Sequence, residues 1–132
     1  MLPITTLTTA FLSLFHVWLA FQVIHLRRRL HVSTGDGGHQ ELTRAIRAHG
    51  NCAEYLPISL ILLGLAELQQ GHPWVLGAFA ALIITGRVLH AMAFLRETAH
   101  LPRRVRGMQC TFIAIIGLAL YAVGLVGSAW LR

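Results

Sequence analysis

Four long segments of helical character constrain the fold of this chain more than any other feature of its sequence. Residues 4–26, 73–95 and 108–131 are apolar, and each exceeds the roughly 20 residues that an α-helix needs to cross the hydrocarbon core of a bilayer. A chain of 132 residues that is 55% hydrophobic and only 12% charged cannot bury so much apolar surface inside a water-soluble domain. We therefore expect an integral membrane protein that forms one all-α domain over residues 1–132.

The fourth segment, residues 43–68, is less apolar because its first half carries charged side chains. Its apolar second half, residues 55–66, is too short to cross a bilayer alone. Helical spacing continues through both halves, so we expect a full span that contains Pro57. The sequence thus predicts a four-helix membrane bundle with spans at about 4–26, 43–68, 73–95 and 108–131.

The distribution of arginine predicts the orientation of these spans. All 11 basic residues are Arg, against 5 acidic residues. The second connection has none, whereas the first and third connections carry Arg27, Arg28, Arg29, Arg96, Arg103, Arg104 and Arg106. Because arginine-rich loops stay in the cytoplasm, we expect loops one and three to be cytoplasmic and both termini to lie outside; Arg132 argues weakly against this. This topology also accounts for the basic charge without a nucleic-acid partner.

Polar residues of the second span form one stripe. At 100° per residue, its members fall within an arc of about 100°, and the stretch from Arg44 to Glu54 covers about 15 Å of helix. We call this set the polar stripe; it comprises Arg44, Arg47, Asn51, Glu54 and Tyr55.

On the third span, Arg87 and His90 share a face with Phe94, and Arg87 reaches about the depth of Glu54 on the neighbouring helix. Ionisable groups inside a membrane are costly, so they pair or line a polar site. One interpretation is a structural Glu54–Arg87 ion pair. The other is an anion pocket, lined by both spans, for a small zwitterion with carboxylates, such as a peptide.

Two motifs carry a resemblance to a known family. Arg47-Ala-His-Gly-Asn51-Cys-Ala-Glu54-Tyr55, followed at the right spacing by Gly86-Arg87-Val-Leu-His90-Ala91, resembles the MAPEG family of membrane-associated proteins in eicosanoid and glutathione metabolism. The resemblance is to a bacterial-type member. It implies a homotrimer of four-helix protomers in the inner membrane, with glutathione bound between subunits near the cytoplasmic side.

The resemblance also implies roles for individual residues. Arg47, Asn51, Glu54 and Tyr55 match the glutathione-contacting positions of the second helix, and His90 matches a position that is Tyr or His in the family. From the pocket interpretation we add Arg87 to the binding residues. Phe94 stands where the family usually has a second Tyr, which removes a hydroxyl from the site.

The implied chemistry is activation of the glutathione thiol. A thiol with a pKa near 8.5 is mostly protonated at neutral pH, and a nearby guanidinium favours the nucleophilic thiolate. We assign this role to Arg104, with Arg103 and Arg106 as alternatives, and note that all three suit loop anchors equally well.

We therefore expect a glutathione transferase or peroxidase that acts on a lipophilic electrophile from the bilayer. The alternative is a non-catalytic member that binds a ligand or a protein. A small multidrug exporter is disfavoured, because the first span has no acidic residue.

The histidines and cysteines do not suggest a further cofactor. His16 has no predicted partner at its depth, so we expect no haem, and no metal-ligand spacing is present. Cys52 and Cys110 are far apart and form no CxxC motif, which argues against disulfide exchange.

Overall fold

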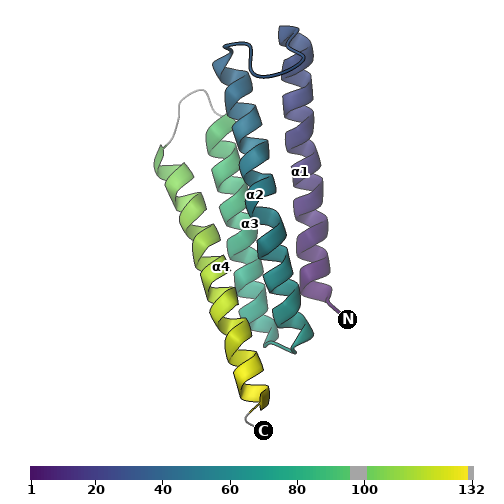
Figure 1. The fold of residues 1–132 in the computed structure, drawn as a ribbon, viewed down its shortest axis with the longest axis vertical. Helices are drawn as coiled ribbons and strands as arrows, with labels where there is room; N and C mark the ends of the chain where they lie inside the picture. Colours follow the sequence, from purple (N-terminus) through teal and green to yellow (C-terminus); the bar gives the residue numbers. More distant parts are fainter. Residues whose placement is uncertain (96–100, 131–132) are drawn as a thin grey trace.

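The computed structural model describes residues 1–95 and 101–130, and it consists of four helices (Figure 1). Each helix is long and apolar enough to cross a membrane. The predicted all-α, four-helix architecture is confirmed. The helices are α1 (Pro3–Leu30), α2 (Gln40–Leu68), α3 (Pro73–Leu95) and α4 (Leu101–Trp130).

The prediction for α3 matches its observed bounds, but the prediction for α4 begins too late. The helix starts at Leu101 instead of residue 108, so Arg103, Arg104 and Arg106 lie in its first two turns. Pro102 is compatible with this start, because the first turn of a helix has no hydrogen-bond acceptor for the missing N–H. The predicted loop residue Arg96 and the end of the last predicted span, at 131, lie outside the described residues, as does Arg132.

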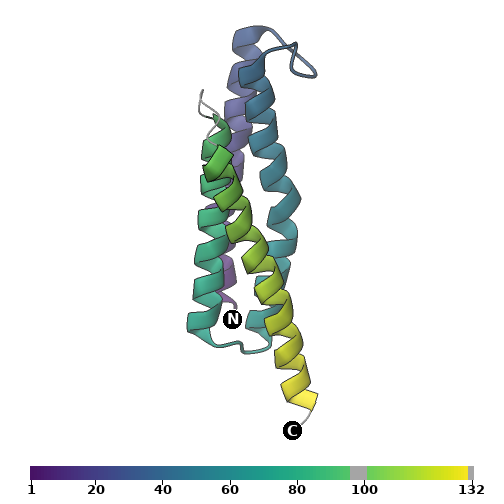
Figure 2. The ribbon, with the colours of Figure 1, turned by 90° about the vertical axis from the view of Figure 1, so that its left-hand side faces the viewer.

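The second helix lies at the centre of the arrangement. It packs against α1, α3 and α4, and α3 also packs along α4. Among the described residues, α1 contacts α2 and α3 but not α4. The side view shows α4 crossing the bundle obliquely, and the beginning of α1 and the end of α4 lie at the same end of the bundle (Figures 1 and 2). The polar stripe therefore belongs to one of the two helices, α2 and α3, that contact all three others.

The close contact between α3 and α4 depends on two glycines. A Cβ atom on Gly86 would lie 2.6 Å from the Thr111 hydroxyl oxygen and 2.9 Å from the Gly107 carbonyl oxygen. A Cβ atom on Gly107 would lie 2.7 Å from the backbone nitrogen of His90. Small residues permit such close helix packing in membranes. The two backbones thus touch at the level of the Gly86-Arg87-Val-Leu-His90-Ala91 motif.

The beginning of α1 is held by a side chain from the end of α2. The two carboxylate oxygens of Glu67 accept hydrogen bonds from the backbone N–H groups of Ile4 (2.9 Å) and Thr5 (2.8 Å). These N–H groups have no partner inside their own helix, and the N-cap residue Leu2 supplies none. Glu67 therefore fixes the register between α1 and α2.

We expect Gly86→Ala to lower the free energy of unfolding by about 1–3 kcal/mol, because the added methyl group forces α3 and α4 apart. Gly77→Ala is the matched control in the same helix, since nothing lies within 4 Å of its Cβ position. By helix propensity this control is neutral or stabilising. Thermal and denaturant unfolding in detergent measure the stability of both variants. Equal stability of the two would contradict the close contact between α3 and α4.

Candidate functional site

The guanidinium of Arg87 is the centre of the polar interior, and the residue is 1% exposed. Its Nε and Nη2 atoms donate hydrogen bonds to the Thr111 hydroxyl of α4, at 3.0 Å and 2.6 Å. Its Nη1 donates to the side-chain oxygen of Asn51 at 2.8 Å and to the Asn51 carbonyl at 3.2 Å. The Met108 sulfur lies 3.3 Å from Nη2. One α3 side chain thus ties together α2, α3 and α4.

An aromatic ring completes the surroundings of this cation. The guanidinium carbon lies 5.1 Å from the centre of the Tyr55 ring, within the range of a cation–π interaction. Tyr55 in turn packs edge-on against Phe112 of α4, with ring centres 5.7 Å apart. Arg87 is therefore held by neutral acceptors and a π system.

The ion pair between Glu54 and Arg87 is not formed, so this interpretation is wrong for the single chain. Glu54 is exposed, and within the described residues the one salt bridge joins Arg29 to Glu41. The helix geometry gives the reason. Asn51 and Tyr55 lie about 40° apart around α2, and both face Arg87; Glu54 lies about 80° from their midpoint and so points away.

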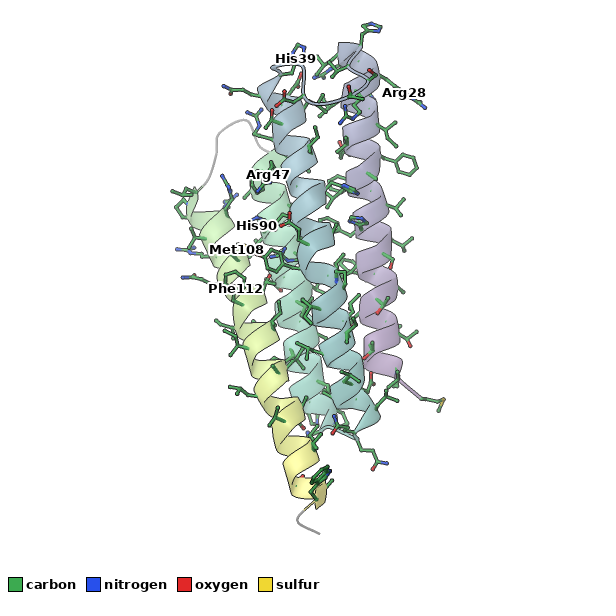
Figure 3. All side chains as sticks on the ribbon, viewed as in Figure 1. Arg28, His39, Arg47, His90, Met108 and Phe112 are labelled. Carbon is green, nitrogen blue, oxygen red and sulfur yellow. The ribbon has the colours of Figure 1, made fainter. Side chains whose placement is uncertain are left out.

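The structure divides the polar stripe into three groups. Asn51 and Tyr55 are half-buried and contact Arg87, whereas Arg47 and Glu54 are exposed on the surface of α2. Arg44 lines a separate cavity, described below. In Figure 3, Arg47 lies above His90, Met108 and Phe112 along the bundle, while Arg28 and His39 lie near the loop-one end.

His90 connects α3 to the start of α4. Its Nδ1 atom lies 2.9 Å from the carbonyl oxygen of Arg104. A carbonyl oxygen can only accept a hydrogen bond. Nδ1 of His90 therefore carries the hydrogen atom and donates the hydrogen bond. The bond leaves Nε2 as the remaining polar atom of the ring and fixes the α4 backbone at Arg104.

Phe94 supports the side chain of Arg104. The guanidinium carbon of Arg104 lies 3.9 Å from the centre of the Phe94 ring, and Phe94 also packs edge-on against His90. The Nε of Arg104 is buried without a hydrogen-bond partner among the described residues. The face of the Phe94 ring thus makes a cation–π contact with the Arg104 guanidinium.

The three candidate catalytic arginines differ in their surroundings. Arg103 and Arg106 are exposed, whereas Arg104 is half-buried. Arg104 and His90 line a largely apolar cavity of about 280 Å³, which we call the Arg104 cavity. Its other lining residues are Leu101, Val105, Met108, Gln109 and Phe112. Of the three, Arg104 has the environment in which a cation acts most strongly on a neighbouring group.

The structure also pairs two histidines that the sequence did not bring together. The rings of His16 on α1 and His49 on α2 stack with centres 4.3 Å apart and planes 17° from parallel. The expectation that His16 has no partner at its depth is therefore wrong. Stacked rings direct their nitrogens sideways and not toward a shared iron. No group of three or more His, Cys, Asp or Glu side chains suited to a metal occurs in the described part of the chain.

These features define a four-span helical membrane protein with a buried arginine at its centre and a second, cavity-lining arginine on its last helix. The profile of the MAPEG family matches residues 5–124, and the chain belongs to this family. It is also similar to the inner membrane protein YecN of Escherichia coli K12, with 34% identity over 101 residues, which are 76% of each chain. The protein of the same name from E. coli O6:H1 strain CFT073 matches to the same extent. The resemblance to a bacterial member of the family is confirmed.

We expect Thr111→Val to destabilise the protein by about 1–3 kcal/mol, because two N–H groups of a buried cation lose their acceptor while the side-chain shape is kept. Thr85→Val in α3 is the control, since Thr85 is exposed. Unfolding in detergent measures the difference. If both substitutions have the same effect, Arg87 does not depend on the Thr111 hydroxyl.

Proposed function

We propose that this protein binds glutathione and acts as a glutathione transferase or peroxidase on lipophilic electrophiles. The observation that carries the proposal is the half-buried Arg104 guanidinium, held over Phe94 and beside His90 at the wall of an apolar cavity. Such a cation favours a thiolate, and the apolar wall suits a hydrophobic second substrate.

The exposed pair on α2 supports the binding half of the proposal. Glutathione carries two carboxylates, one ammonium group and a thiol. Arg47 offers a bidentate donor for a carboxylate, and Glu54 offers an acceptor for the ammonium group. Both side chains are exposed, and neither is needed to neutralise Arg87, so both are available to a ligand. Asn51 and Tyr55 form the inner boundary of the same face.

The proposed chemistry is a thiolate attack. With the guanidinium of Arg104 beside it, the thiol releases its proton to water, and the thiolate sulfur forms a bond to the electrophilic carbon as the leaving group departs with the bonding electrons. With a hydroperoxide, the thiolate instead attacks oxygen, and a second glutathione forms the disulfide while the peroxide is reduced to an alcohol and water.

The distribution of the residues supports a site shared between subunits. Arg47 and Glu54 lie on the exposed surface of α2, whereas Arg104 lies in a cavity between α3 and α4. We propose a homotrimer in which a neighbouring subunit closes over the α2 face. We further propose an inner-membrane location, like that of the relative YecN, with loops one and three cytoplasmic and both termini outside.

A second candidate function follows from Phe94. A phenyl ring donates no hydrogen bond, so this site lacks a hydroxyl that would assist a thiolate. A member of the family that binds a ligand or a protein without turning it over fits this observation. The two candidate functions use the same binding residues. They differ in the role of Arg104, which activates the thiol only in the catalytic candidate.

We expect Arg47→Ala to weaken glutathione binding about tenfold to a hundredfold, because a carboxylate loses a charged hydrogen-bond partner. Glu54→Gln should also weaken glutathione binding, because the ammonium group of glutathione loses its charged acceptor. It should leave the stability of the protein unchanged, since Glu54 does not pair with Arg87. Native mass spectrometry in detergent counts subunits and bound glutathione together. Arg28→Ala, an exposed arginine on α1, is the control; wild-type affinity of Arg47→Ala, or a glutathione-bound monomer, would overturn the site.

Arg104→Ala should retain most of the glutathione affinity but lose thiolate and turnover. The thiolate is followed by its ultraviolet absorbance with glutathione bound, and turnover by a generic chloronitrobenzene electrophile and a hydroperoxide. Phe94→Leu is expected to reduce both readouts in part, because the cation loses its aromatic support. An Arg104→Ala variant that binds glutathione with unchanged thiolate would favour Arg103 or Arg106; a wild type that binds without turnover would favour the non-catalytic candidate.

A further inference from the structure

A second cavity lies at the loop-one end of the bundle, between α1, α2 and α3. It has a volume of about 410 Å³ and shares no lining residue with the Arg104 cavity or with the contacts of Arg87. We call it the loop-one cavity. It is lined by Trp18, Gln22, His25, Leu26, Arg29, Glu41, Arg44, Met92 and Leu95.

The lining of the loop-one cavity combines charged, polar and apolar side chains, with Gln22 and His25 between Trp18 and Arg29 on α1. Arg29, Glu41 and Arg44 lie at its outer end, near the connection between α1 and α2. Trp18 and Met92 lie at its inner end, and both are partly exposed, at 39% and 38%. Trp18 and Arg29 are 11 residues apart in α1, which is about 16 Å along the helix axis. This is the profile of a site for an amphiphile.

The charges at the outer end select an anion. Glu41 is already paired with Arg29. Arg44 is half-buried, and its guanidinium makes no hydrogen bond within the part of the chain that the structure describes. The three side chains therefore leave one positive charge, carried by a planar donor suited to bidentate binding of phosphate.

The position of the cavity favours a lipid source for this anion. The arginines Arg27, Arg28 and Arg29 end α1 here, where a membrane helix meets the headgroup region. Basic pockets between membrane helices bind anionic headgroups. Trp18 offers the amphipathic ring typical of the membrane interface, and Met92 an apolar surface for an acyl chain.

We propose that the loop-one cavity binds one acidic phospholipid, with its phosphate on Arg44 and an acyl chain against Trp18 and Met92. The Arg29–Glu41 pair forms the rim of the site. This site is separate from the proposed glutathione site and does not depend on it.

The test is native mass spectrometry of the protein in detergent, titrated with phosphatidylglycerol or with phosphatidylcholine of the same acyl chains. We expect wild-type protein to retain phosphatidylglycerol preferentially. Arg44→Gln should lower its apparent affinity about tenfold, since one charged donor is lost. Arg28→Gln is the matched control, because it removes one arginine charge at the same end of the bundle and Arg28 does not line the cavity. Arg44→Lys should be intermediate, because it keeps the charge but not the planar donor.

Two outcomes of the lipid titration would contradict the proposal. Equal retention of the two lipids, or an equal loss in Arg28→Gln and Arg44→Gln, would overturn the proposal in favour of general surface charge. A parallel titration with inorganic phosphate separates the two sources of the anion. If millimolar phosphate displaces phosphatidylglycerol, the ligand is a free anion and the lipid assignment is wrong; if it does not, the apolar end contributes as proposed. Size-exclusion profiles show that each variant remains folded and assembled.

Discussion

A buried guanidinium that pairs with no carboxylate within residues 1–95 and 101–130 is the constraint on which this structure depends. Leaving the donors of Arg87 unpaired inside an apolar bundle would cost several kcal/mol, so the neighbouring helices supply acceptors. Thr111 supplies one hydroxyl for two of these donors and itself donates to the Gly107 carbonyl. This arrangement requires close backbones, and the glycines at 86 and 107 provide them.

The contacts that α2 makes with Arg87 also determine which other side chains of α2 reach the surface. Because Asn51 and Tyr55 face the cation, Glu54 lies about 80° away and is released to the surface with Arg47. The polar stripe is thus divided. Asn51 and Tyr55 stabilise the bundle through Arg87, Arg47 and Glu54 carry opposite charges on the surface of α2, and Arg44 lines the loop-one cavity. This division separates the effects of substitutions, since the outer pair can be changed without exposing the buried cation.

The second arginine, Arg104 on α4, is held by a cation–π contact and not, within the described residues, by hydrogen bonds to its guanidinium. Phe94 presents its ring face to Arg104, and the hydrogen bond from His90 fixes the backbone beneath it. At this position a phenyl ring, which has no hydroxyl, supports the cation through its aromatic face. The Arg104 cavity and the loop-one cavity have no lining residue in common.

The sequence by itself determined the class of the protein. Apolar runs of membrane-spanning length require helices in a bilayer, because only helices satisfy their own backbone groups there, and the spacing of two motifs was sufficient to indicate the family. It also placed Arg87 level with the polar stripe of α2, as the contacts with Asn51 and Tyr55 confirm, because the rise per residue of a helix is fixed. Only the tertiary structure decided which side chains on different helices contact one another. A pattern on one helix does not say which side meets which neighbour, so the Glu54–Arg87 pair was wrong, while the Thr111 acceptor, the stacked His16 and His49, and the Glu67 contacts with α1 were not found. Those contacts join residues far apart in the chain, and they exist because close packing brings specific faces of different helices within hydrogen-bond distance.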